Sequence, residues 1–277
     1  MKQKITNIKN IILIGSGKGG VGKSATAMNL AVALSVAGKK VGLLDADIYG
    51  PSVPKMLSVN KSAFPVSDDG KEITPAVAHG IKCMSMGFLV EEGEPIVWRG
   101  PMLGSALKQM LFQTAWGELD TLVVDMPPGT GDVQISIANM VEISGAVIVS
   151  TPQDVALMDV TKAINMFKKV NIPILGMVEN MSTFICPECS HESHIFGHNG
   201  ALKLAEEMGL DVLAQIPLDL DIRINTDAGK PVVLSMPNNP QAKIYRDLAD
   251  KITDKLENMP APQIVADDKV KVVIETS

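Results

Sequence analysis

Short, near-continuous apolar runs alternate along this chain with longer segments whose apolar residues recur at helical spacing. Such runs predict strands that are buried on both faces, and the segments between them predict helices that cover those faces. The predicted strands are residues 11–14, 40–45, 121–125, 146–150, 174–179 and 212–217. The predicted helices are one that carries Ala27, Leu30, Ala31, Leu34 and Ala37, and residues 102–116, 156–170, 201–208 and 240–256. This alternation predicts an α/β fold with a doubly wound, mostly parallel sheet.

Two stretches depart from the alternation. Residues 48–71 are rich in Pro, Ser and Gly and predict a loop with a short helix near residues 53–57. Residues 72–78 and 81–85, separated by His79-Gly80, predict a hairpin or two paired short strands.

The domain organisation follows from length and from the last residues. A chain of 277 residues is long enough for one large domain. The stretch after the last predicted helix begins with two prolines, and residues 270–274 could form an extra strand. We expect one domain over residues 1–258 and a C-terminal tail over residues 259–277.

Composition and charge exclude several classes of protein. The net charge of −6 argues against a general nucleic-acid binder, which usually carries a basic footprint. No apolar run approaches the roughly 20 residues that span a bilayer, and the first residues lack the pattern of a signal peptide. Three cysteines do not make a secreted disulfide framework, and Cys83, in a predicted strand, needs no role beyond packing. We therefore expect a cytoplasmic protein with neither nucleic acid nor membrane as partner.

A glycine-rich stretch joins the first predicted strand to the first predicted helix. It matches the pattern G-x-x-x-x-G-K-S, and its strand–turn–helix context indicates a phosphate site. Glycine lets successive backbone N–H groups converge on phosphate oxygens, and the helix adds the positive end of its dipole. We expect Lys23 to reach the β- and γ-phosphates of a nucleoside triphosphate and the Ser24 hydroxyl to ligate Mg²⁺. The residues expected to bind nucleotide here are Gly17, Lys18, Gly19, Gly20, Val21, Gly22, Lys23, Ser24 and Ala25.

Lys18 is a second lysine in the same loop, directly after its first glycine. As a solvated loop charge it would need no role. Two lysines from one short loop would, however, crowd each other at a single phosphate. We therefore interpret Lys18 as a contact to phosphate across a dimer interface.

Two of the predicted strands end in aspartates. Asp45 ends the second predicted strand, with Asp47 two residues later, and Asp125 ends the third. The carboxyl ends of parallel strands are where ligands bind in open α/β sheets. We expect Asp125 to polarise Mg²⁺, directly or through water, and the Pro-Pro-Gly-Thr-Gly of residues 127–131 to sense the γ-phosphate.

Asn180 follows the predicted strand at residues 174–179. Its amide has the paired donor and acceptor that could read the edge of an adenine base. An asparagine that caps a turn explains the same position equally well.

Cys186 and Cys189 form a C-x-x-C pair, whose spacing lets two thiolates converge on one metal ion or iron–sulfur cluster. Three histidines follow the pair within the segment 184–198: His191, His194 and His198. These histidines could complete a structural zinc site, and a redox pair is a further alternative. Two cysteines supply half of a four-thiolate site, and a symmetric dimer would supply the other half on its two-fold axis. Lys18 and the cysteine pair thus both indicate a homodimer.

Six sequence motifs occur in this order along the chain: GKGGVGKS, LLDADIYGPS, DMPPGTGD, VENMS, CPEC and IFGHNG. With them the chain resembles the Mrp/ApbC (Nbp-type) iron–sulfur carrier ATPases over residues 10–256. The wider group of deviant Walker-A ATPases includes MinD, ParA and the nitrogenase iron protein. The resemblance implies a P-loop ATPase that binds ATP and Mg²⁺, hydrolyses ATP slowly without a partner, and forms a homodimer. It also implies a [4Fe–4S] cluster at the dimer interface and its transfer to apo-proteins.

The resemblance assigns roles around the triphosphate. Lys18 matches the signature lysine that reaches the partner's ATP, and Lys23 and Ser24 match the Walker-A lysine and the Mg²⁺ ligand. Asp47 matches the aspartate that positions the hydrolytic water, and Asp125 matches the Walker-B carboxylate. We expect Lys18, Lys23 and Asp47 to be the catalytic residues.

The resemblance assigns roles to three further residues. Asn180 matches an adenine-recognising position, and Cys186 and Cys189 match the pair that bridges a [4Fe–4S] cluster between subunits. Many bacterial members carry an additional small N-terminal domain, whereas about ten residues precede the first strand here.

Two rival functions belong to other classes. A MinD/ParA-like positioning ATPase would need a basic patch or a basic amphipathic C-terminal helix. The last predicted helix mixes both signs: Lys243, Arg246, Lys251 and Lys255 with Asp247, Asp250, Asp254 and Glu257. An ATP-switched scaffold with a structural zinc is the second rival, and zinc could also occupy the cysteines of protein purified in air. We favour the carrier, with apo iron–sulfur proteins and cluster donors as partners.

Overall fold

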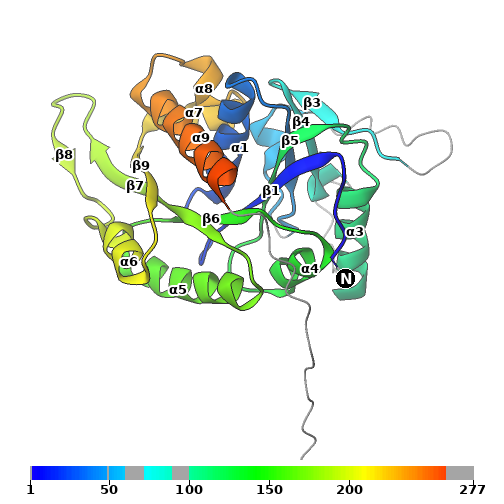
Figure 1. Ribbon diagram of the computed structural model, residues 1–277. Coiled ribbons are helices and arrows are strands. Elements are labelled where there is room, and N and C mark those ends of the chain that lie inside the picture. Colours follow the sequence, from blue (N-terminus) through cyan, green and yellow to red (C-terminus); the bar gives the residue numbers. More distant parts are fainter. Residues whose placement is uncertain (1, 49, 60–71, 89–99, 260–277) are drawn as a thin grey trace, which may run out of the picture.

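A computed structural model describes residues 2–48, 50–59, 72–88 and 100–259. Within these ranges one nine-stranded sheet, mostly parallel, carries helices on both faces (Figure 1). The strands are β1 (Ile8–Gly15), β2 (Val41–Asp45), β3 (Ala76–Ala78), β4 (Ile81–Ser85), β5 (Leu119–Asp125), β6 (Gly145–Ser150), β7 (Ile174–Ile185), β8 (Glu192–Ser193) and β9 (Val212–Leu218). The predicted fold class, a doubly wound α/β sheet, is confirmed.

The strand order places β1 at the centre of the sheet. The order is β3-β4-β2-β5-β1-β6-β7-β8, and β9 pairs with β7. Only β3 and β8, at the margins, pair antiparallel among the described strands. Asp125 is in register with both Ile14 of β1 and Asp45 of β2, so the carboxyl ends of three neighbouring strands lie side by side. This edge is where an open α/β sheet binds its ligand.

Helices cover the two faces of the sheet. They are α1 (Lys23–Val36), α2 (Val53–Met56), α3 (Gly100–Phe112), α4 (Asp132–Met140), α5 (Asp154–Lys169), α6 (Gly200–Met208), α7 (Leu220–Asp227), α8 (Val232–Ser235) and α9 (Pro240–Asn258), with a 3-10 turn η1 (Met86–Phe88). Figure 1 shows α4, α5 and α6 along one face and α1, α8 and α9 along the other. No helix in the described ranges is long and apolar enough to cross a membrane.

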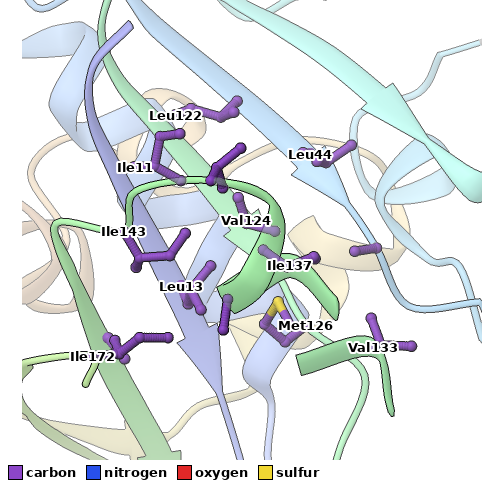
Figure 2. Close-up of a cluster of buried hydrophobic side chains, with 14 of the residues drawn as sticks. Ile11, Leu13, Leu44, Leu122, Val124, Met126, Val133, Ile137, Ile143 and Ile172 are labelled. Carbon is purple, nitrogen blue, oxygen red and sulfur yellow. The ribbon is translucent and has the colours of Figure 1, made fainter. Parts of the chain in front are cut away.

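The core consists of two aliphatic layers, one on each face of the sheet. Successive strand residues point to opposite faces, so Leu13 packs with Val124 against Ile137 of α4 (Figure 2). Ile12 and Ile14, on the opposite face, pack into the layer that α1 and α9 cover. Because both faces are buried, these strands read as continuous apolar runs in the sequence.

The predicted elements differ from the structure mainly at their ends. The helix predicted over residues 102–116 is α3, which ends at Phe112 because the backbone beyond it pairs with Ile73 instead. The strand predicted over residues 174–179 continues to Ile185 in β7. The short helix and the hairpin predicted near residues 53–57 and 72–85 are present as α2 and as β3 with β4.

Some short elements were not predicted from the sequence, and one predicted strand falls outside the described residues. Short elements such as β8, α7 and α8 carry no clear periodic pattern. The tail after residue 259, with the strand suggested at residues 270–274, lies outside the described residues. The domain division at residue 258 stays a prediction.

Candidate functional site

The glycine-rich loop packs tightly against two neighbouring elements. A Cβ atom on Gly17 would lie 2.3 Å from the backbone carbonyl carbon of Asp159 in α5. A Cβ atom on Gly22 would lie 2.1 Å from Asn180 Nδ2, and the positive φ of Gly22 (81°) further disfavours a side chain there. Gly22 is the N-cap residue of α1, so the glycine-rich loop runs directly into the N-terminus of that helix, where backbone N–H groups are free to bind an anion. The loop therefore has the geometry of a phosphate cradle, held in place from both sides.

Lys23 lies among carboxylates from two other strand ends. Its Nζ donates to Asp125 Oδ1 at 2.6 Å and lies 3.5 Å from Asp47 Oδ2. It also donates to Ser24 Oγ at 3.2 Å. The side chain of Lys23 is 6% exposed and that of Asp125 is fully buried. The structure thus brings four predicted site residues together: Lys23, Ser24, Asp47 and Asp125.

Asp125 has the features of a cation ligand. Burial raises its pKa, and the Lys23 ammonium and the Ser24 hydroxyl oppose that rise. Its second oxygen, Oδ2, is buried without a hydrogen-bond partner. A buried oxygen without a partner costs free energy unless a ligand satisfies it, and hard cations such as Mg²⁺ prefer oxygen ligands. Asp125 and the adjacent Ser24 hydroxyl therefore fit the predicted Mg²⁺ site.

Asp45 organises the loop that carries Asp47. Asp45 Oδ1 accepts from the backbone N–H of Asp47 at 3.1 Å, and Oδ2 accepts from Val53 N–H at 3.2 Å. The Ser85 hydroxyl, on β4, donates to the same Oδ2 at 2.9 Å. Burial, with the nearby charge of Asp125, raises the pKa of Asp45 to about 7 despite these donors. Asp45 is thus a positioning residue. The sequence indicated only that Asp45 lies near Asp47 at the end of a strand, and assigned it no role of its own.

The raised pKa of Asp45 predicts a pH-dependent stability. In the unfolded chain this carboxyl has a pKa near 3.8, so between about pH 4 and pH 7 the folded protein binds the extra proton. Its contribution to the free energy of unfolding therefore falls as pH rises through that window, by up to about 1.4 kcal/mol per pH unit. We expect Asp45→Asn to lose this slope, measured by urea unfolding at half-unit intervals from pH 5 to pH 8.

A matched control is Asp247→Asn, which removes a half-exposed carboxylate on α9. Stability profiles that run parallel for the wild type and Asp45→Asn across the whole range would contradict the prediction.

The loop after Asp125 is fastened at both ends. Gly129 N–H donates to the Ser16 carbonyl at 2.8 Å, which ties this loop to the glycine-rich loop. The Gln134 amide, on α4, donates to the carbonyls of Pro127 and Gly129 at 2.8 and 3.0 Å. Gln134 matches no sequence motif, so its role could not be predicted from the sequence. It is evident only in the fold, where α4 packs against this loop.

Lys18 has a different environment from Lys23. Its side chain is exposed, and no ion pair found in the described ranges includes it. An exposed lysine is free to contact a group from another molecule. The position agrees with the interpretation of Lys18 as a contact to a second subunit, which stays a prediction.

Asn180 contacts the glycine-rich loop directly. Its Nδ2 donates to the Val21 carbonyl at 2.8 Å. The residue lies in β7, in register with Ile216 of β9. It therefore lies beside the expected nucleotide site, although its amide donor is already used by the protein backbone. Adenine recognition by Asn180 stays a prediction.

The two cysteines lie at the tip of a hairpin that projects from the sheet (Figure 1). β7 and β8 form its arms, with Phe184 opposite Ser193. The tip closes through two backbone hydrogen bonds, Cys186 N–H to the His191 carbonyl at 3.0 Å and Ser190 N–H to the Cys186 carbonyl at 2.8 Å. Cys186 is partly exposed and Cys189 is exposed, so both thiols can be reached from outside the chain.

The tip stabilises a thiolate at Cys186. Backbone N–H groups of Cys189 and Glu188, and the Cys189 side chain, lower the pKa of the Cys186 thiol. Metal ions and clusters bind the thiolate form. Cys83 is the opposite case, because burial raises its pKa to about 12. The chain thus has two thiols suited to metal binding at the tip and one inert thiol in the core.

The histidines do not complete a metal site within one chain. In the described ranges, no three His, Cys, Asp or Glu side chains gather at metal-binding distance. His194 and His198 instead contact each other, with ring centroids 4.0 Å apart. The described residues thus do not bring the cysteine pair and these histidines together as a zinc tetrahedron, and the zinc alternative stays a prediction.

Comparisons with known proteins agree over most of the chain. A family model for NUBPL iron-transfer P-loop NTPases, of the ParA type, matches residues 7–253. The iron–sulfur cluster transfer protein NUBPL of Mus musculus is 54% identical over 262 residues, which cover 94% of this chain and 82% of the mouse protein. The iron–sulfur cluster carrier protein of Pseudomonas fragi is 53% identical over 245 residues, 88% of this chain and 85% of that protein. Among solved structures, a nucleotide-binding protein of Archaeoglobus fulgidus in complex with ADP has a TM-score of 0.74 and 36% identity, covering 87% of this chain and 94% of its own.

Proposed function

Because this chain belongs to the NUBPL iron-transfer P-loop NTPase family, we propose that it is an ATP-dependent carrier of iron–sulfur clusters. Relatives more than half identical to it bear the names of cluster transfer and carrier proteins. The observation that carries the proposal is the exposed hairpin tip, where Cys186 and Cys189 present half of a four-thiolate site. A second copy of the chain supplies the other half, so that a [4Fe–4S] cluster is held between two hairpins and passed on to apo-proteins.

The nucleotide side of the proposal rests on the cluster of charges at the strand ends. Phosphate oxygens compete with Asp125 for the Lys23 ammonium, which the loop already holds at the start of α1. Mg²⁺, when bound, would neutralise phosphate charge, with Ser24 and Asp125 as its protein partners. The backbone N–H of Asp47 donates to Asp45 Oδ1, which fixes the position of Asp47. The Asp47 carboxylate orients the attacking water and accepts its proton. A 36% identical protein of this fold is described in complex with ADP, which supports a nucleotide at this site.

One experiment tests the carrier function as a whole. The protein is reconstituted with iron and sulfide without oxygen, and metal content, sulfide content and oligomeric state are measured with and without ATP. We expect a four-iron cluster in a dimer and its transfer to an apo-protein acceptor. A reconstituted protein that stays monomeric, or binds only zinc, would refute the proposal.

Lys18 is the residue that should separate dimer formation from nucleotide binding. In the proposed dimer its exposed ammonium contacts the partner's nucleotide. Loss of a buried charge contact across an interface costs about 2 kcal/mol or more, so Lys18→Ala is expected to raise the dissociation constant of the ATP-bound dimer by at least about 30-fold. Sedimentation at several protein concentrations measures this constant.

The matched control is Lys108→Ala, which removes an exposed lysine from α3. An ATP-bound dimer that is equally stable in Lys18→Ala and Lys108→Ala would show that Lys18 makes no contact between subunits.

A further inference from the structure

The cysteine hairpin is an extension of the strand that contacts the nucleotide loop. β7 passes Asn180 beside the loop and ends at Ile185, and Cys186 follows directly. Asn180 Nδ2 donates to the Val21 carbonyl at 2.8 Å, and Gly22 leaves no room for a Cβ atom against the same amide. A displacement of this part of the loop must therefore move Asn180 or break its hydrogen bond.

The regular pairing of β7 with β9 is interrupted directly after Asn180. Asn180 is in register with Ile216 of β9, but the next paired residue of β7 is Phe184, opposite Leu218. Four residues of β7 thus advance while β9 advances two, which is a bulge. Met181, the first residue of the bulge, has a left-handed backbone with φ of 55°. A non-glycine residue in that conformation marks a strained position, and here it lies where the regular pairing of β7 with β9 is interrupted.

Glu179, the residue before Asn180 in β7, holds the chain where it returns from the hairpin to α6. Glu179 is fully buried, and its Oε2 accepts from Ala201 N–H, in the first turn of α6, at 2.8 Å. Its Oε1 accepts from Gln215 Nε2 at 2.8 Å, and Gln215 also donates to Asn199 at 3.2 Å. Adjacent strand residues point to opposite faces. Glu179 therefore holds the end of the hairpin on one face while Asn180 holds the nucleotide loop on the other.

We infer that Asn180 is a positioning residue that couples nucleotide occupancy of the glycine-rich loop to the reactivity of the cysteine pair. The route is Val21, Asn180, the bulge at Met181 and the hairpin arm that ends at Cys186. A nucleotide fixes the loop, and through Asn180 it fixes the base of the hairpin. The two backbone hydrogen bonds that close the tip at Cys186 then break less often, and the thiols react more slowly. This inference rests on the proposed nucleotide site but not on the identity of the bound metal or cluster.

The test measures how fast iodoacetamide alkylates Cys186 and Cys189 with and without saturating Mg-ADP. Sedimentation under the same conditions confirms that the alkylation rates are those of single chains. Peptide mass spectrometry reads each thiol separately, and the buried Cys83 is an internal reference. We expect ADP to slow alkylation at the tip by at least about fivefold, the lower end of typical coupling between sites.

Two variants at the coupling residue and one control complete the test. Asn180→Ala removes the amide, and Asn180→Asp keeps the shape but removes the donor to the Val21 carbonyl. The slowing by ADP should disappear in both, with each variant assayed at its own saturating ADP concentration. Asn7→Ala is the control, because the Asn7 amide also donates to a backbone carbonyl, that of Gly117 at 2.7 Å, but lies before the start of β1 and off the proposed route. It is expected to retain the response.

The outcomes are distinct. Equal rates with and without bound ADP in the wild type, faster alkylation with ADP, or an undiminished response in both Asn180 variants would each overturn the inference while leaving the proposed carrier intact. Failure of the wild type to bind ADP, measured by calorimetry, would refute the nucleotide site and the inference together.

Discussion

Lys23→Ala is expected to lower ATP turnover by a factor of about 10³, since it removes the charge that we propose faces the transferred phosphoryl group in a buried site. The same change is expected to lower the free energy of unfolding by about 3 kcal/mol. Asp125 would then be left buried without its ion pair, and breaking such a pair from one side is strongly destabilising. Turnover is measured by phosphate release, and stability by urea unfolding at pH 7.

The control for this substitution is Lys39→Ala. Lys39 pairs with Glu257 at 3.4 Å on the surface, where an ion pair contributes at most about 1 kcal/mol. We expect turnover in this variant to match the wild type. If Lys23→Ala kept turnover within about tenfold of the wild type while still binding ATP, the proposed role of Lys23 would be wrong.

Cys186→Ala with Cys189→Ala is expected to abolish the iron load of the reconstituted protein. The wild type should hold about two iron atoms per chain, as half of a shared four-iron cluster. The double variant retains no thiol at the hairpin tip, and the three nearby histidines do not gather into a metal site. Iron and sulfide analysis with absorption spectroscopy measures the loss, and nucleotide binding is expected to persist.

Cys83→Ala is the matched control, because it also removes a thiol but from the buried core. It should keep the full iron load and lose only about 1 kcal/mol of stability. A double variant that retains the wild-type iron content would refute the assignment of the cluster to the hairpin.

The fold and the centre of the nucleotide site were predictable because their signals are local. The apolar run before the loop, the glycines and the helix after it lie within one short stretch, and Asp125 directly ends another apolar run. Parallel pairing then brings these ends together, as the register of Ile14 with Asp125 shows. Local pattern and sheet topology together account for the cluster around Lys23.

Contacts between distant residues were not predictable. Asp45 depends on Ser85, forty residues away, and meets it only because β2 pairs with β4. The end of α3 depends on Ile73, which takes up the backbone beyond Phe112. Proximity in sequence likewise does not predict the ring contact between His194 and His198.

In the proposed function, the exposed hairpin tip is expected to make the protein sensitive to air whenever no cluster is bound. A thiolate stabilised by backbone N–H groups is the form that oxidants attack, and Cys189 beside it is exposed as well. Oxidation of either sulfur, or a bond between the two, would remove the ligands that a cluster requires. A cell that uses such a protein must keep these two sulfurs reduced between one delivery and the next.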